Sequence, residues 1–364
     1  MTETPTPETG TRTDLTAAVQ AALRAPSVHN TQPWRWRIDP DAVQLHADHH
    51  RHLAATDPDR RDLLISCGAA LHHLRVALAG QGIAAAVKLL PDPENRAHLA
   101  TVRPVAGCPA PHLRRMWPSV AVRRTDRRQL SPRPVPVELL NALVAHAATE
   151  GALLVPVTAP ERRRQLLVAL AEASVLQRTQ AGFAAELQLW THRPVGAHDG
   201  VPTHNVPPPP LGTSAPIPQR SFGPTGLSRA PTQPGRHPDV DDGSVFLALL
   251  TTEDTTHHRL RAGQATSAVL LTATDTGLAT TPFSQAVEVQ ASRLRLRRDI
   301  LGVPEHPQLV VRVGWPIAGA GPVPPSPRRP LDAVLINLVP VDPAAPAGAP
   351  PGPGLTGVVE GRPT

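Results

Sequence analysis

Apolar residues recur along the chain at two spacings, one typical of helices and one typical of strands. The clearest helix is residues 61–79, where Leu64, Cys67, Leu71, Leu74 and Leu78 fall on one stripe. Asp57-Pro58, just before this helix, is typical of a helix start, and Gly80 is typical of a helix end. Further helices are expected at 15–24, 136–149, 161–178 (continuing after a break through 183–190) and 259–276. Strands are expected at 34–38, 43–46, 83–90, 97–105, 152–157, 245–251 and 309–314.

The order of these elements repeats. Residues 67–83 align without gaps on residues 262–278, so that Gly68 matches Gly263 and Gly82 matches Gly277. Alanine-rich amphipathic helices align easily by chance. However, each aligned helix is followed by a loop and a strand, and a helix–turn–strand outline precedes it. The sequence therefore predicts an α+β protein with an internal duplication.

Composition divides the 364 residues into a globular part and irregular segments. Hydrophobic residues make up 40% and aromatic residues only 2%, so the core must be built from Ala, Leu and Val. Many of the 45 prolines lie outside the periodic stretches. We expect a disordered tail at 1–12, a Pro-rich cover or linker at 193–238 and a Pro/Gly-rich tail at 336–364.

Several classes of function receive no support. The net charge of +6 is spread over arginines interleaved with acidic residues, which favours a local phosphate site over a nucleic-acid surface. Residues 46–52 are rich in histidine but have no metal-ligand spacing, so no metal is expected. Two cysteines form no disulfide framework. No signal sequence, membrane span, P-loop, GxGxxG or GxSxG motif is present, and we expect a cytoplasmic protein.

The stretch Ala25-Pro26-Ser27-Val28-His29-Asn30-Thr31-Gln32-Pro33-Trp34 joins the first helix to the first strand. Its two prolines exclude a helix and hold the backbone extended or turning. Ser27, Asn30 and Gln32 can then donate hydrogen bonds to a planar polar ligand. The alternative is an ordinary connection in which a Ser or Asn side chain caps the backbone.

This stretch, read as PSxxNxQPW, resembles the flavin-contacting loop of the FMN-binding nitroreductase family, and its flanks resemble the Acg-like branch. The resemblance implies an intertwined dimer in which one subunit supplies this loop and the other an RRSxR-like phosphate motif. Here the loop lies in the first half, and Arg123-Arg124-Thr125-Asp126-Arg127 opens the second. One chain would therefore mimic the homodimer, as a monomer with halves at 13–110 and 111–335 and a single site.

The resemblance also implies the residues of that site, with FMN as the cofactor. Residues 277–285 resemble the loop whose backbone faces the isoalloxazine ring, and 327–331 resemble a C-terminal phosphate-binding segment. No catalytic acid or base is required, because the flavin carries the chemistry. Arg127 is the candidate for the positive charge beside flavin N1. The implied contacts are Pro26, Ser27, Asn30, Gln32, Arg123, Thr125, Arg127, Pro282, Phe283, Ser284, Arg328 and Arg329.

Three functions are consistent with this interpretation. The first is an FMN-dependent oxidoreductase that passes electrons from NAD(P)H to a small, aromatic or quinone-like acceptor. The second is a protein that sequesters FMN beneath residues 193–238 with little turnover. The third is a scaffold that has lost flavin. Uptake of FMN separates the third from the others, and anaerobic reduction by NADPH separates the first two.

Overall fold

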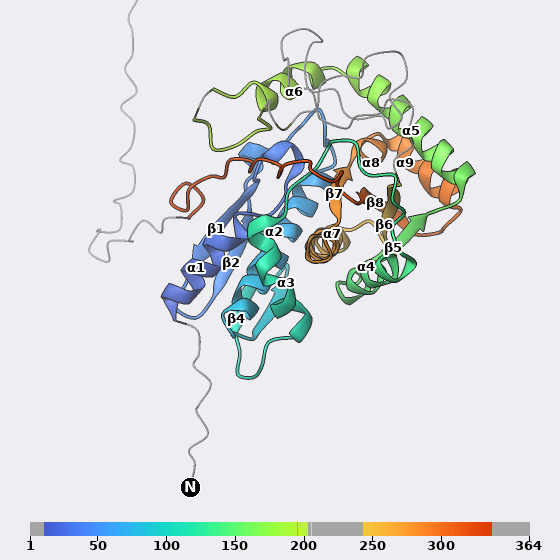
Figure 1. Ribbon diagram of the computed structural model, residues 1–364. Coiled ribbons are helices and arrows are strands. Elements are labelled where there is room, and N and C mark those ends of the chain that lie inside the picture. The colour runs from blue at the N-terminus through green and yellow to red at the C-terminus, as the bar shows by residue number, and fades with distance from the viewer. Residues whose placement is uncertain (1–10, 195, 203–204, 206–242, 337–364) are drawn as a thin grey trace, which may run out of the picture.

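The computed structural model describes residues 11–194, 196–202, 205 and 243–336, and its strands form two four-stranded antiparallel sheets (Figure 1). Numbered by their order in the chain, the strands lie across each sheet in the order first, second, fourth, third. A register shift interrupts the second–fourth pairing in both sheets. The first sheet contains β1 (Trp34–Ile38), β2 (Val43–Ala47), β3 (Ala85–Leu89) and β4 (His98–Pro104). The second contains β5 (Leu153–Val157), β6 (Val245–Thr251), β7 (Ala279–Phe283) and β8 (His306–Gly314).

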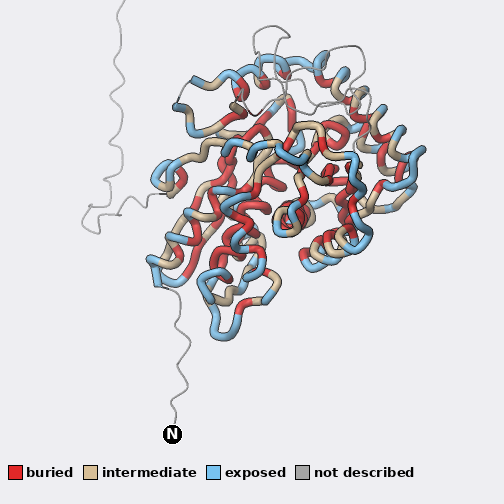
Figure 2. The backbone as a smooth tube through the Cα atoms, in the orientation of Figure 1, coloured by how far each residue is buried: buried red, intermediate tan, exposed pale blue. Residues whose placement is uncertain are grey.

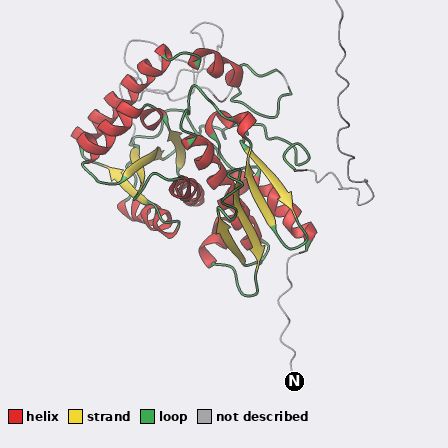
Figure 3. Ribbon diagram, turned by 180° about the vertical axis from the view of Figure 1, so that it is seen from behind, coloured by secondary structure: helices red, strands yellow, loops and turns green. Residues whose placement is uncertain are grey.

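Two long helices, α2 (Arg61–Gly80) and α7 (Thr256–Asp275), pack side by side between the sheets (Figures 1 and 3). They come closest at Gly68 and Gly263, where a Cβ on either glycine would meet the backbone of the other helix. The remaining helices are α1 (Arg12–Ala22), α3 (Pro111–Val122), α4 (Val137–Thr149), α5 (Pro160–Thr179), α6 (Phe183–Thr191), α8 (Gln285–Glu288) and α9 (Gln290–Arg295). Short turns are η1 (Val28–Asn30), η2 (His49–Arg51) and the π-helical η4 (Leu296–Leu301).

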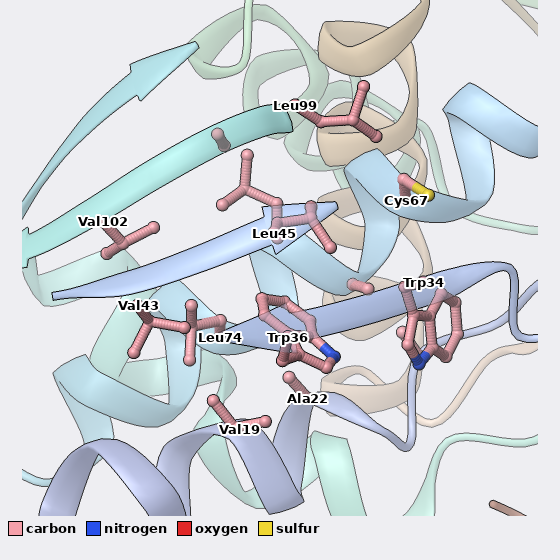
Figure 4. Close-up of a cluster of buried hydrophobic side chains, with 14 of the residues drawn as sticks. Val19, Ala22, Trp34, Trp36, Val43, Leu45, Cys67, Leu74, Leu99 and Val102 are labelled. Carbon is pink, nitrogen blue, oxygen red and sulfur yellow. The ribbon is translucent and has the colours of Figure 1, made fainter. Parts of the chain in front are cut away.

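Buried residues gather along the sheets and the two central helices, whereas α5 and α6 have exposed residues on their outer faces (Figure 2). In the first sheet Trp34 and Trp36 are fully buried and pack with residues of α1 and α2, such as Val19 and Leu74 (Figure 4). Burying an aromatic side chain of this size contributes roughly 2–3 kcal/mol, so these two residues anchor the strand that follows the PSxxNxQPW loop.

α2 is the helix, within the described ranges, that is long and apolar enough to cross a bilayer by length and composition. Most of that apolar stretch is buried inside the protein against α7, α1 and α3. It is therefore packed as the core helix of the fold.

The structure differs from the sequence expectations in three places. α1 begins at Arg12, inside the expected tail, because Thr11 and Asp14 form a capping box. α3 was not expected, because Pro118 interrupts a pattern whose buried residues pack against α2 and α7. Residues 279–283, expected as a loop, form the edge strand β7, where Pro282 needs no ladder partner on its open side.

The end of the described chain returns to the first sheet. Trp36 N–H donates to the Val334 carbonyl at 2.8 Å, and Ile336 N–H donates to the Trp36 carbonyl at 2.7 Å. This parallel pairing beside β1 carries Arg328 and Arg329 back to the PSxxNxQPW loop, about 300 residues earlier in the chain. Most of the expected cover at 193–238, the 1–10 segment and nearly all of the 336–364 tail lie outside the described residues.

Candidate functional site

The PSxxNxQPW loop has an unusual backbone. His29, Asn30 and Gln32 adopt positive φ values of 46°, 55° and 51°. Residues other than glycine rarely adopt this left-handed backbone conformation, which costs roughly 1–2 kcal/mol for each residue. Ser27 Oγ accepts a hydrogen bond from Gln32 N–H at 2.9 Å, and Ser66 Oγ accepts one from Val28 N–H at 3.2 Å. Strain held in place by such contacts is typical of functional loops.

The Asn30 side chain fastens this loop to two distant segments. Its Nδ2 donates to the carbonyl oxygens of Gly200 and Pro327 at 2.9 and 3.0 Å. Its Oδ1 accepts from Arg328 Nη1 at 2.9 Å. The amide is therefore fully engaged by protein groups, although Asn30 lines a cavity.

Gln32 and Arg329 bind each other and line neither cavity described below. Gln32 Oε1 accepts from Arg329 N–H at 2.8 Å, and Gln32 Nε2 donates to the His198 carbonyl at 2.9 Å. The Arg329 guanidinium donates to the Gln32 carbonyl at 3.2 Å and lies 3.5 Å from an Asp48 carboxylate oxygen. These contacts give both residues a role in holding the loop.

The first cavity, cavity 1, lies where the loop meets residues 123–127 and 323–328, and it encloses about 670 Å³ when space open to solvent is included. None of its described lining residues carries a carboxylate. The lining residues are Arg24, Pro26, Ser27, Asn30, Arg123, Arg124, Thr125, Arg127, Val201, Asn205, Val323, Pro324, Pro325, Ser326 and Arg328.

Two arginines of cavity 1 are held in an unfavourable setting. Arg123 is only 4% exposed, and its Nε and Nη1 have no hydrogen-bond partner within the described chain. Burial and the positive charge of Arg124 lower the pKa of Arg123 to about 10. Burial and the neighbouring arginines, Arg123 foremost, lower the pKa of Arg328 to about 9, and its Nε is also unpartnered there. Buried N–H groups without acceptors favour an incoming anion.

The second cavity, cavity 2, adjoins cavity 1 and shares Pro26, Ser27, Thr125 and Arg127 with it. Its empty volume is about 850 Å³. Apolar and hydroxyl side chains form most of its lining, and α2, α7 and β7 contribute part of them, with one carboxylate, Asp62. The remaining lining residues are Val28, His29, Ile65, Ser66, Ala69, Thr266, Thr281, Pro282, Phe283, Ser284, Gln285 and Leu309.

The edge of β7 positions the arginine motif between the cavities. Thr125 forms a parallel bridge with Thr280, and Asp126 N–H donates to the Thr280 carbonyl at 2.9 Å. Asp126 in turn pairs with Arg128 through two hydrogen bonds of 2.8 and 2.7 Å. Arg128 is thereby held away from cavity 1. The arginines of the motif that line cavity 1 are Arg123, Arg124 and Arg127.

The structure thus brings together the residues expected from sequence, except Gln32 and Arg329. The expectation missed Arg24, which no sequence signal marks, and Arg124, which lies inside the quoted motif. It also missed Asp62, Ser66 and Thr266, whose places on α2 and α7 follow only from the packing of those helices.

No protein-family model matches the chain. A Mycobacterium tuberculosis protein named "Putative NAD(P)H nitroreductase Rv3131" is 43% identical over 324 residues, covering 89% of this chain and 90% of that protein. "Putative NAD(P)H nitroreductase acg" of the same organism is 36% identical over 333 residues, covering 90% and 97%. A Desulfitobacterium hafniense nitroreductase crystallised with FMN aligns with 12% identity and a TM-score of 0.38 over 62% of this chain and 98% of that one.

Proposed function

The chain belongs to the nitroreductase family of these mycobacterial relatives, Acg among them, and on this premise we propose that it binds one FMN across the two adjoining cavities and passes electrons from NAD(P)H to a small organic acceptor. The observation that carries the proposal is the pair Arg123, which is buried, and Arg328, which is half-buried. Nε and Nη1 of Arg123 and Nε of Arg328 have no partner within the described chain, and no lining carboxylate lies among the described residues.

The polar end of FMN fits cavity 1. A phosphate monoester carries close to two negative charges and is bound best by arginine forks. Arg123 and Arg328 supply the charge, and the hydroxyl groups of Ser27 and Thr125 add donors at the boundary with cavity 2. Arg329, which the sequence also implied, instead supports the loop through Gln32. We therefore assign the phosphate to Arg123 and Arg328.

The ring of FMN fits cavity 2, whose lining is less charged. When bound, FMN supplies the hydride chemistry, so the protein has to orient the ring and limit the access of water. Pro26 and Pro282 give rigid walls from opposite halves. The backbone N–H groups of Phe283 and Ser284 are candidates for ring contacts, and Arg127, which lines both cavities, is the candidate for positive charge beside the ring.

We further propose that one chain imitates a dimer. The two sheets share one strand order, and the aligned glycines Gly68 and Gly263 meet at the crossing of α2 and α7. Gly82 and Gly277, also aligned, have φ values of 83° and 80°. The loop at 26–34 and the arginine motif at 123–127 come from different halves, divided near residue 110. This supports a monomer with a single site.

A sequestering function is the alternative, and one observation favours it. His198 and Gly200 bind the loop through Gln32 and Asn30, so part of the 193–238 segment sits against the proposed site. A cover there would limit turnover. In anaerobic mixing with NADPH, an oxidoreductase loses its flavin colour within seconds, whereas a sequestering protein stays yellow for minutes or longer.

Titration of the purified protein with FMN, followed by flavin fluorescence, tests the binding proposal. We expect Arg123→Ala and Arg328→Ala each to weaken binding by about 1.5–3 kcal/mol, the range for a hydrogen bond to a charged group. Arg114→Ala is the control, because Arg114 is exposed on α3 and lines neither cavity. Equal FMN affinity in the two cavity variants and the control would show that the phosphate lies elsewhere.

A further inference from the structure

Five arginines line cavity 1. Arg127 is the candidate for positive charge beside the ring, and the other four form an inner and an outer pair. Arg123 and Arg328 are the inner pair described above. In the outer pair, Arg24 is exposed and Arg124 is partly exposed. Both outer guanidiniums donate to the same carbonyl, Ala121 at the end of α3, at 3.5 Å from Arg24 and 2.9 Å from Arg124. The two cations therefore converge at one point on the rim of the cavity.

The charges of cavity 1 do not balance with FMN alone. Apart from Arg127, which the proposed function places beside the ring, four guanidiniums carry four positive charges, and a phosphate monoester brings about two negative ones. The described lining contains no carboxylate that could neutralise the rest. About two positive charges remain, and they lie on the outer pair, since the inner pair is the more buried. Like charges held close together repel each other, and an anion between them relieves that repulsion.

We propose that Arg24 and Arg124 form a second anion subsite at the mouth of cavity 1, which binds a phosphate group separate from that of FMN. The inference rests on the proposed function, because that function assigns Arg123 and Arg328 to the FMN phosphate. Guanidinium groups match the geometry of phosphate oxygens, and the shared Ala121 carbonyl holds the two side chains toward the same position.

The phosphate can come from two sources with the same chemistry. One is inorganic phosphate from solution. The other is the electron donor, because the 2′-phosphate of NADP(H) is a monoester that NAD(H) lacks. The oxidised forms NADP⁺ and NAD⁺ distinguish these sources, since they bind without reducing the flavin.

Calorimetric titration of the FMN-loaded full chain with inorganic phosphate, at constant ionic strength in chloride, tests the subsite. We expect one phosphate site, and at least a tenfold loss of affinity in both Arg24→Gln and Arg124→Gln. The matched control is Arg114→Gln, which removes one positive charge from α3 outside the cavity and should leave phosphate affinity within twofold. Absorbance of the same samples reports whether FMN stays bound.

A preference for NADP⁺ over NAD⁺ that falls at least tenfold in Arg24→Gln supports the subsite and identifies the donor as its source. Phosphate binding with equal affinities for NADP⁺ and NAD⁺ supports it with inorganic phosphate as the occupant. The inference is overturned if FMN-loaded protein binds no phosphate, if the cavity variants behave like Arg114→Gln, or if Arg24→Gln loses FMN. A wild-type chain that takes up no FMN contradicts the proposed function instead.

Discussion

Replacing Gly68 with alanine tests how the two halves are joined. A Cβ at Gly68 would lie 2.9 Å from the Cα of Gly263 and closer still to the carbonyl oxygen of Leu260. Both contacts are with backbone of α7, so no side-chain rotation can relieve them, and the helices must separate. At Gly263 the mirrored clash is with the Cα of Gly68, at 2.8 Å.

Two opposing effects set the size of the change. Alanine is better than glycine inside a helix by about 1 kcal/mol. Overpacking a close-packed interior costs about 1–3 kcal/mol, and a clash with backbone belongs at the upper end. We therefore expect Gly68→Ala to lower the free energy of unfolding by a net value of about 2 kcal/mol, and Gly263→Ala to do the same.

Urea unfolding followed by circular dichroism measures this change. Gly321→Ala is the matched control, because a Cβ there meets no atom within 4 Å and its φ is not positive, so the free energy of unfolding should rise by no more than about 1 kcal/mol. If Gly68→Ala is as stable as the wild type or more stable, the close crossing of α2 and α7 is not a constraint on the fold.

Two further predictions concern the buried ion pairs and the thiols. Burial opposes the charge of Asp254, but hydrogen bonds from Arg61 and Arg259 outweigh it and hold the pKa of Asp254 well below its ordinary value. The contribution of Asp254 to the free energy of unfolding is therefore present above about pH 4 and is lost as the pH falls further. Asp254→Asn should lower the free energy of unfolding in urea by roughly 2–4 kcal/mol at pH 7, because Arg61 stays buried without its partner. The difference from the wild type should shrink toward pH 2, and a difference independent of pH would contradict this prediction. Burial raises the pKa of the Cys67 thiol, so a thiol reagent should modify the exposed Cys108 at once and Cys67 only after unfolding; rapid reaction of both would contradict its burial.

The sequence predicted the elements of the site because its signals are local. Two prolines around small polar residues mark the 26–34 loop, and a run of arginines marks 123–128. The central helices followed from their apolar stripes. α3 was missed because Pro118 hides its spacing, and β7 because an edge strand tolerates Pro282.

What the sequence could not give are the contacts between distant segments. Asn30 and Gln32 were expected to face a ligand, but their amides bind Gly200 and His198 as well as residues 327–329. Side-chain direction in a loop depends on which segments return to it, and no local pattern encodes that return. Arg24 is one of many arginines in the sequence, and only the packing of the chain places it at cavity 1.

A crystal structure of the full chain with FMN tests most directly where the cofactor binds. We expect one flavin per chain, with its phosphate within hydrogen-bonding distance of Arg123 and Arg328 in cavity 1 and its ring in cavity 2 between Pro26 and Pro282. A flavin bound elsewhere, or a phosphate that contacts neither arginine, would contradict this expectation.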